Sequence, residues 1–245
     1  MQAAAYADHR PDYPAAGIRW VLAGAEHEPR RVLDLGAGTG KLTEGLLALG
    51  MRVTGVEPDR DMRAELNSRL AGVSAVDGSA ERIPLADSAV DAVLVGQAFH
   101  WFDPQPALTE IARVLRPGGV LGALWNHEDV RVDWVAEFGE LTRSSVCRSR
   151  GFGGDIPPHQ AFGPFEHASF AHFHRRTADS LTATIGTHSH TLVISAAERE
   201  DLLARVRRYL ASRPETAHGE FELPLHTTVV RGRRRSARVA LEDQA

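Results

Sequence analysis

The chain has 245 residues, of which 43% are hydrophobic and 24% are charged, and its formal net charge is −4 at pH 7. This composition is typical of a globular protein with one large core, and the acidic balance excludes a global positive field that would attract nucleic acid. The single cysteine, Cys147, excludes an intramolecular disulfide and a cysteine-based zinc site. The first residues lack the pattern of a signal peptide, and no segment is apolar over a bilayer-spanning length. We therefore expect a cytoplasmic protein that binds neither membranes nor nucleic acids.

From about Arg30 to Asn126, short apolar runs alternate with amphipathic stretches whose apolar residues follow helical spacing. Asp59 is placed to cap one of these helices, and Pro117 with Gly118 is expected to end another. This strand–helix–strand alternation predicts a parallel sheet with right-handed crossovers. The predicted strands are residues 31–36, 51–58, 72–78, 89–96 and 120–126, and the predicted helices are residues 41–50, 59–70 and 105–119.

After Asn126 the pattern is less regular. Ser195 and Glu198 fit a capping box at the start of an amphipathic helix, and Pro224 suggests an edge or bulge position for the last strand. The basic run at Arg231–Arg235 is interpreted as a solvated tail. The predicted helices here are residues 134–146 and 195–210, the predicted strands are 167–174 and 219–232, and the glycine- and proline-rich segment 151–164 is expected to be a loop.

The stretch VLDLGAGTG, residues 32–40, joins the first predicted strand to the first predicted helix of the core. Its glycines allow the backbone to approach a ligand closely, and the N–H groups at the start of the helix face that ligand. The spacing G-x-G-x-G of Gly36, Gly38 and Gly40 differs from the G-x-G-x-x-G of dinucleotide folds. Glu57 ends the next strand, where an acidic residue can accept hydrogen bonds from both hydroxyls of a ribose. The two features together predict a site for a nucleoside-containing cofactor.

These residues carry a family resemblance. VLDLGAGTG and the following VTGVEPDRDM resemble the first two motifs of the class I S-adenosylmethionine-dependent methyltransferases. Residues 78–102 and the LRPGGVL of residues 115–121 resemble the following strand regions of the small-molecule branch of that family. An N-terminal element is similar to one found in trans-aconitate methyltransferase-like proteins; it comprises Tyr6, Arg10, Pro11, Tyr13 and Pro14.

The resemblance implies an α/β, Rossmann-like, doubly wound, seven-stranded sheet that is mostly parallel, with an antiparallel last strand and a small lid region. We expect residues 1–245 to form a single methyltransferase domain, with a cofactor-binding core over residues 30–126 and a partly separate substrate or lid region over residues 129–218. The implied cofactor is S-adenosyl-L-methionine and the implied partner is a small-molecule acceptor.

The resemblance also implies roles for individual residues of the core. Asp34, Gly36, Ala37 and Gly38 would hold the amino-acid end of the cofactor, and Asp34 is alternatively a buried structural acid. The remaining parts of the cofactor would contact residues farther along the chain. These are Glu57 and Pro58 at the ribose, Met62 at the adenine face, Ser79, Ala80 and Glu81 at the adenine edge, and Gln97 beside the sulfonium. Many relatives carry aspartate where Ser79 stands, so a serine or backbone oxygen would have to replace the usual adenine contact.

The segment GQAFHWFDP contains the candidate catalytic residue. His100 titrates near neutrality and could remove a proton from an acceptor, or it is a structural histidine beside Trp101. Trp101 is expected to line the substrate pocket. The histidine pair His172 and His174 would share one face of a strand, but no acidic or cysteine partner is placed nearby, and we expect no metal.

The N-terminal element is expected either to fold over the pocket as a lid or to dock on the sheet as a tail. As a lid, Arg10 would bind the cofactor carboxylate, and Tyr6 and Tyr13 would close the substrate pocket.

Three alternatives to a small-molecule methyltransferase stay open. A nucleic-acid methyltransferase is disfavoured by the acidic charge and by GQAFHW in place of an Asn/Asp-Pro-Pro-aromatic motif. A nicotinamide-dependent dehydrogenase is disfavoured by the glycine spacing. A non-catalytic cofactor-binding partner is compatible with the same motifs. The sequence identifies neither the acceptor atom nor the oligomeric state.

Overall fold

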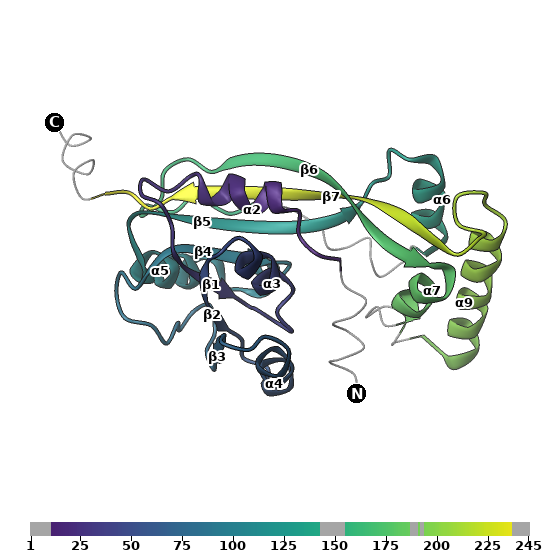
Figure 1. The fold of residues 1–245 in the computed structure, drawn as a ribbon, viewed down its shortest axis with the longest axis horizontal. Coiled ribbons are helices and arrows are strands. Elements are labelled where there is room, and N and C mark those ends of the chain that lie inside the picture. The colour runs from purple at the N-terminus through teal and green to yellow at the C-terminus, as the bar shows by residue number, and fades with distance from the viewer. Residues whose placement is uncertain (1–10, 143–154, 187–190, 192–193, 237–245) are drawn as a thin grey trace. The chain divides into compact units, whose positions relative to one another are not determined.

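A computed structural model describes residues 11–142, 155–186, 191 and 194–236 of the chain (Figure 1). The strands are β1 Arg31–Leu35, β2 Arg52–Val56, β3 Ser74–Val76, β4 Val90–Gly96, β5 Leu115–Glu128, β6 Glu166–Thr177 and β7 Glu220–Arg233. The helices are α2 Ala15–Leu22, α3 Lys41–Ala48, α4 Arg60–Arg69, η1 Phe99–Trp101, α5 Pro104–Val114, α6 Asp133–Thr142, α7 Ala178–Gly186 and α9 Ala196–Ala211.

The strands form one seven-stranded sheet in the order β3-β2-β1-β4-β5-β7-β6. The pairs from β3 to β5 are parallel, with Leu33 of β1 opposite Thr54 of β2 and Val93 of β4. Strand β7 runs antiparallel to β5, because Arg234 N–H donates to Gly119 O at one end of the pair and Asp129 N–H donates to Pro224 O at the other. The predicted α/β class and the antiparallel last strand are confirmed.

The structure divides into two compact units. The first comprises Met1–Asn126, Gly154–Phe170 and Thr227–Ala245, and the second comprises His127–Gly153 and Ala171–His226. The second unit has its own core, formed by apolar residues of α6, α7 and α9 and the first half of β7. The expected lid role of residues 129–218 stays a prediction.

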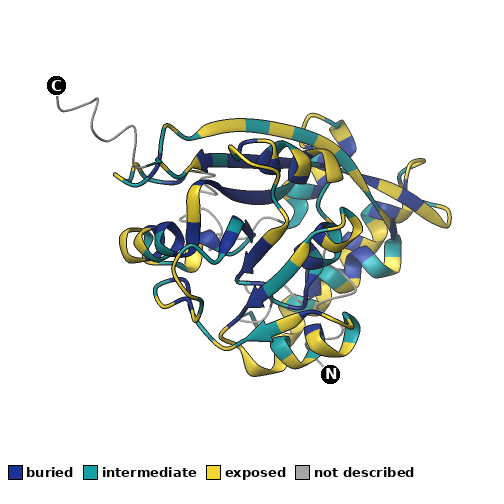
Figure 2. Ribbon diagram, turned by 60° about the vertical axis from the view of Figure 1, so that its left-hand side comes forward, coloured by how far each residue is buried: buried dark blue, intermediate teal, exposed yellow. Residues whose placement is uncertain are grey.

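The first unit buries apolar side chains on both faces of its strands. Figure 2 colours buried residues dark blue, and this colour covers much of the inner strands. Alternate residues of one strand point to opposite faces, so Val32 packs with residues of α2 and α3 while Leu33 packs with residues of α5. This double coverage explains the nearly continuous apolar runs that the sequence has in the core strands. Among the described residues, no helix is long and apolar enough to cross a membrane.

Local sequence signals placed the helix starts correctly. The Asp59 carboxylate accepts hydrogen bonds from Asp61 N–H and Met62 N–H, both at 2.9 Å. Ser195 and Glu198 form the predicted capping box on α9. The alternating segment around residues 167–174 is part of β6, where exposed and half-buried residues alternate as expected for an outer strand.

Two expectations about the ends and edges of segments need correction. Helix α5 ends at Val114, and Pro117 and Gly118 lie within β5 instead of ending the helix. Strand β7 lies between β5 and β6, so of the two positions predicted for Pro224 the edge strand is wrong, and the bulge stays a prediction. The sheet tolerates this proline because it removes only one ladder donor, and its carbonyl still accepts from Asp129 N–H at 3.0 Å.

The basic run at residues 231–235 is not a solvated tail. The Arg231 guanidinium lies 4.0 Å from the centre of the Trp20 ring, donates to Trp20 O at 2.6 Å and pairs with Glu166 at 2.7 Å. Arg233 donates to Gly24 O and Arg235 donates to Phe162 O. These arginines therefore fasten the end of β7 to segments that are distant in the sequence.

We predict that Arg231→Ala lowers the free energy of unfolding by about 1–2 kcal/mol, because it removes a cation–π contact and hydrogen bonds to a charged donor. Urea unfolding followed by circular dichroism measures the change. Arg207→Ala, at an exposed position of α9, is the matched control and should change stability by less than about 0.5 kcal/mol. Equal stability of the two variants would contradict the fastening role.

Candidate functional site

The loop after β1 adopts a backbone that favours glycine at three positions. Gly36, Gly38 and Gly40 have φ of +72°, +55° and +94°. A Cβ at Gly36 would lie 2.6 Å from the Cβ of Ala98, so larger residues cannot fit there. At Gly38 the nearest described atom to such a Cβ is the Met62 Sδ at 4.0 Å, so the loop is open on this side. Gly40 then begins α3 as its N-cap residue.

Glu57 holds this loop from the neighbouring strand. Its Oε2 accepts from Gly38 N–H and its Oε1 accepts from Asp59 N–H, both at 2.9 Å. The side chain is largely buried, at 7% exposure, directly after the end of β2. Each carboxylate oxygen can accept more than one hydrogen bond, so Glu57 retains capacity for hydroxyl donors.

Asp34 lies beneath the loop and is completely buried. Its Oδ2 accepts from the Thr43 hydroxyl at 2.6 Å, whereas its Oδ1 has no hydrogen-bond partner among the described residues. Burial, opposed by the Thr43 hydrogen bond and reinforced by the charge of Glu57, raises the pKa of Asp34 from 3.8 to about 7. A buried carboxylate oxygen without a donor is costly, and a cationic or hydrogen-bonding ligand at the loop would relieve this cost.

The predicted adenine-edge residues form a turn after β3. Ser79 and Arg82 make an antiparallel bridge, and Ala80 is buried. Burial acts to raise the pKa of Glu81, but hydrogen bonds from Asp103 N–H, from its own backbone and from the Ser79 hydroxyl hold it below the ordinary value. Ser79 therefore orients Glu81, and this turn presents oxygen acceptors. Pro58 accepts from Arg63 at 2.7 Å through its carbonyl.

Gln97 and Asn126 join the ends of β4 and β5. Gln97 has a φ of +56°, which is rare outside glycine, and its Nε2 donates to Asn126 O at 3.0 Å. The Asn126 side chain donates to the carbonyls of Pro11 and Asp12, and its Oδ1 accepts from Thr227 at 2.6 Å. The sequence did not single out Asn126, although a polar residue at the end of a buried apolar run was a usable signal.

The N-terminal segment is anchored at the same edge of the sheet. Asp12 pairs with Lys41, the first residue of α3, at 3.0 Å. The Tyr13 hydroxyl lies where a Cβ on Gly96 would come within 2.6 Å, so the ring crosses the end of β4. Tyr6 and Arg10 lie outside the described residues.

The short helix η1 carries the candidate base. His100 is exposed, and its ring centre lies 5.0 Å from that of Trp101, which is 70% exposed. Phe99 is buried and packs against Phe102 and Trp125. The fold therefore places Phe99 in the core and leaves His100 and Trp101 at the surface of the first unit. Among the described residues, no cluster of three or more His, Cys, Asp or Glu side chains could hold a metal ion.

Comparisons with known proteins relate this chain to methyltransferases. Residues 33–123 match a family model described as a methyltransferase domain. An uncharacterized methyltransferase of Mycobacterium tuberculosis (strain H37Rv) is 41% identical over 233 residues, covering 93% of this chain and 91% of the relative. Another, from Schizosaccharomyces pombe, is 31% identical and covers 85% of each chain.

A solved structure from Anaeromyxobacter dehalogenans, provisionally described as a type II methyltransferase, is similar with a TM-score of 0.67 and 26% identity. It covers 92% of this chain and 97% of the other. The fold is thus that of the class I methyltransferases. The chain belongs to the methyltransferase family, as the sequence motifs predicted.

We predict that Asp34→Asn stabilises the ligand-free protein at pH 8 by about 1–3 kcal/mol and that this gain shrinks toward pH 5. Because the folded-state pKa is raised from 3.8 to about 7, ionisation of Asp34 destabilises the folded protein increasingly as pH rises through this window. Denaturant unfolding at several pH values measures the difference. Asp61→Asn, at an exposed position of α4, is the control; a gain for Asp34→Asn that does not change with pH would contradict the raised pKa.

Proposed function

We propose that this protein transfers a methyl group from S-adenosylmethionine to a small-molecule acceptor by in-line displacement. The observation that carries the proposal is the hydrogen bond from Gly38 N–H of the glycine loop to the Glu57 carboxylate. Beside it, the buried Asp34 has a hydrogen-bond donor for only one of its two carboxylate oxygens among the described residues. This arrangement offers acceptors for an ammonium group and for ribose hydroxyls within one cradle. The acidic net charge and the sequence GQAFHW after β4 favour a small acceptor over a nucleic acid.

The residues of the cradle fit the parts of this cofactor. Asp34 would hold the ammonium group of the amino-acid end, together with the backbone of Gly36, Ala37 and Gly38. Glu57 would accept hydrogen bonds from the ribose hydroxyls, using the carboxylate lone pairs that are not occupied by the backbone N–H donors Gly38 and Asp59. Met62, which borders the open side of Gly38, would pack on the adenine face. The turn at Ser79, Ala80 and Glu81 would accept from the adenine edge, and Gln97 would lie beside the sulfonium.

S-adenosylmethionine supplies an activated methyl group on a sulfonium, so the protein has to align the acceptor and exclude water. The bond to Asn126 O fixes Gln97 at the end of β4, where an acceptor would be oriented. His100 is the candidate group that removes a proton from the acceptor. Trp101, beside His100, would cover the acceptor with its exposed ring.

We also propose that the N-terminal segment acts as a lid. The anchored residues Asp12 and Tyr13 hold the chain against α3 and β4, close in sequence to Arg10 and Tyr6. From this anchor Arg10 would bind the cofactor carboxylate bidentately, and Tyr6 with Tyr13 would exclude water from the pocket.

S-adenosylhomocysteine should stabilise the protein and NAD should not, since a ligand that binds only the folded state raises its stability by RT ln(1 + [L]/Kd). At a hundredfold excess over Kd, we expect the melting temperature to rise by about 5–10 °C. Thermal shift measurements with both compounds check this expectation. A shift with NAD alone would overturn the cofactor assignment.

Glu57→Gln should weaken S-adenosylhomocysteine binding about tenfold or more, because hydrogen bonds to a charged acceptor contribute about 1.5–3 kcal/mol each. Isothermal titration calorimetry measures the affinity, and circular dichroism verifies that the variant is folded. Glu200→Gln, at an exposed position of α9, should bind like the wild type. A folded Glu57→Gln variant with wild-type affinity would show that Glu57 is not the ribose ligand.

Cleavage by chymotrypsin after Tyr6 should slow at least severalfold when S-adenosylhomocysteine is added, because a closed lid protects the Tyr6–Ala7 bond. Asn126→Ala removes the side-chain donor to Pro11 O and Asp12 O, and cleavage should then be faster in both states. The time course is followed by mass spectrometry. Equal cleavage rates with and without ligand in the wild type would leave the segment as a docked tail.

A further inference from the structure

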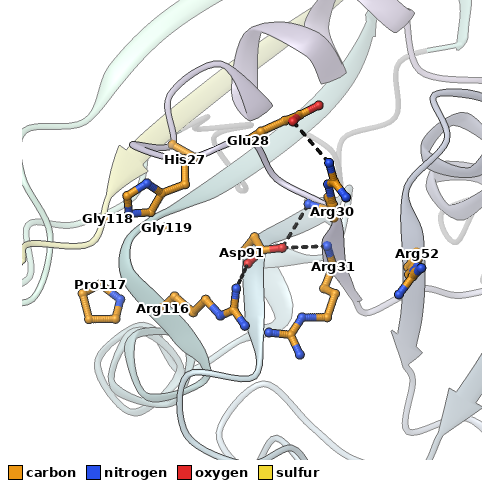
Figure 3. A pocket seen from close by; sticks show the side chains of 11 residues that line it. His27, Glu28, Arg30, Arg31, Arg52, Asp91, Arg116, Pro117, Gly118 and Gly119 are labelled. Carbon is orange, nitrogen blue, oxygen red and sulfur yellow. Dashed lines mark hydrogen bonds and ion pairs between the residues drawn. The ribbon is translucent and has the colours of Figure 1, made fainter.

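A second pocket lies at the opposite ends of the strands that carry the glycine loop and Glu57. Its volume is about 340 Å³, and it is lined where β1, β2, β4 and β5 begin (Figure 3). Arg31 is the first residue of β1, Arg52 is the first residue of β2, and Arg116 is the second residue of β5. A strand of five residues is about 16 Å long, so this pocket is separate from the proposed cofactor cradle.

The pocket lining is strongly cationic, in contrast to the acidic chain as a whole. Four arginines line it against two acidic residues, which are Glu28 and Asp91. His27 also lines the pocket. The remaining lining residues are uncharged and small, and they include Ala25, Pro117 and two glycines.

Asp91 holds the arginines of this pocket in place. Its Oδ2 accepts from Arg30 N–H at 3.0 Å and from Arg31 N–H at 2.8 Å, and its Oδ1 pairs with the Arg116 guanidinium at 2.9 Å. Figure 3 shows the side chains of Arg31 and Arg116 running toward the same space beside Asp91. One carboxylate thus fixes the backbone of two arginines and the guanidinium of a third.

Two of the four guanidinium groups have no acidic partner among the described residues. Arg30 pairs with Glu28 at 3.6 Å and Arg116 pairs with Asp91, whereas no ion pair joins Arg31 or Arg52 to a described carboxylate. Arg31 and Arg52 are also directly opposite each other in the β1–β2 register. Their backbones lie on neighbouring strands, about 4.8 Å apart, so the two positive charges add to the positive potential at this end of the sheet.

We propose that this pocket binds a small molecule that carries a phosphate monoester group. Guanidinium groups bind phosphate oxygens bidentately, and a dianion would balance the unpaired charges of Arg31 and Arg52. A volume of about 340 Å³ exceeds what a phosphate group needs, so the uncharged lining by Pro117 and the adjacent glycines accommodates the organic part. The site is independent of methyl transfer and of the cofactor.

The first test measures binding of glycerol 3-phosphate, ribose 5-phosphate, inorganic phosphate and succinate to the full chain by isothermal titration calorimetry at constant ionic strength. We expect saturable binding of at least one phosphate monoester, severalfold tighter than inorganic phosphate, with succinate weaker still. If inorganic phosphate binds as tightly as both monoesters, the pocket does not recognise the organic group of the ligand. If no phosphate compound shows saturable binding, the proposed phosphate site is wrong.

The second test locates the binding. Arg31→Gln and Arg52→Gln should each weaken the monoester about tenfold or more, whereas Arg207→Gln, which removes the same charge from an exposed position of α9, should not. Arg31→Lys keeps the positive charge but loses the planar guanidinium that binds phosphate bidentately, so this variant should also bind the monoester more weakly than the wild type. Equal weakening by Arg207→Gln, or full binding by both pocket variants with verified folding, would contradict the proposal. Affinity for S-adenosylhomocysteine, measured in the same variants, should stay unchanged and so separates this site from the cofactor cradle.

Discussion

The hydrogen bond from Gly38 N–H to the Glu57 carboxylate is the interaction on which the proposed cofactor site depends. It joins the loop after β1 to the end of β2, and two further bonds, from Gly36 N–H and Ala37 N–H to Val56 O, strengthen the same connection. The loop is thus held open toward Met62 and closed toward Ala98 before any ligand arrives. Binding to such a preorganised cradle avoids most of the entropy loss that ordering a flexible loop would cost.

Asp34 has the opposite character, because its burial is unfavourable in the isolated protein. Such local cost at a site is consistent with a position selected for ligand binding, since the same carboxylate in a purely structural role would have its remaining oxygen satisfied. The two acidic residues of the cradle therefore have different roles. Glu57 fixes the conformation of the loop, and Asp34 keeps one carboxylate oxygen able to accept a hydrogen bond.

The sequence predicted those features that depend on local chemistry. The glycine spacing, the acidic end of β2 and the Asp59 cap all follow from residues within a short window, and the structure has each of them. The sequence did not predict contacts between segments that are distant along the chain. The arginines after Val230 were interpreted as a tail because their partners, Trp20 and Gly24 among them, lie about two hundred residues earlier in the chain. The pocket around Asp91 was missed for the same reason, since it exists only once four strands, β1, β2, β4 and β5, are in register.

The position of β7 in the sheet has a consequence for folding. β7 is the last of the strands in the chain, yet it lies between β5 and β6, so β6 has no neighbour in the sheet until β7 has been made. During synthesis the parallel strands β1 to β5 can pair in turn, whereas β6 has to wait, with its backbone donors and acceptors unpaired, for about 40 more residues to emerge. Such long-range pairing is slow, and it makes completion of the sheet the step in which the nascent chain is most exposed to aggregation.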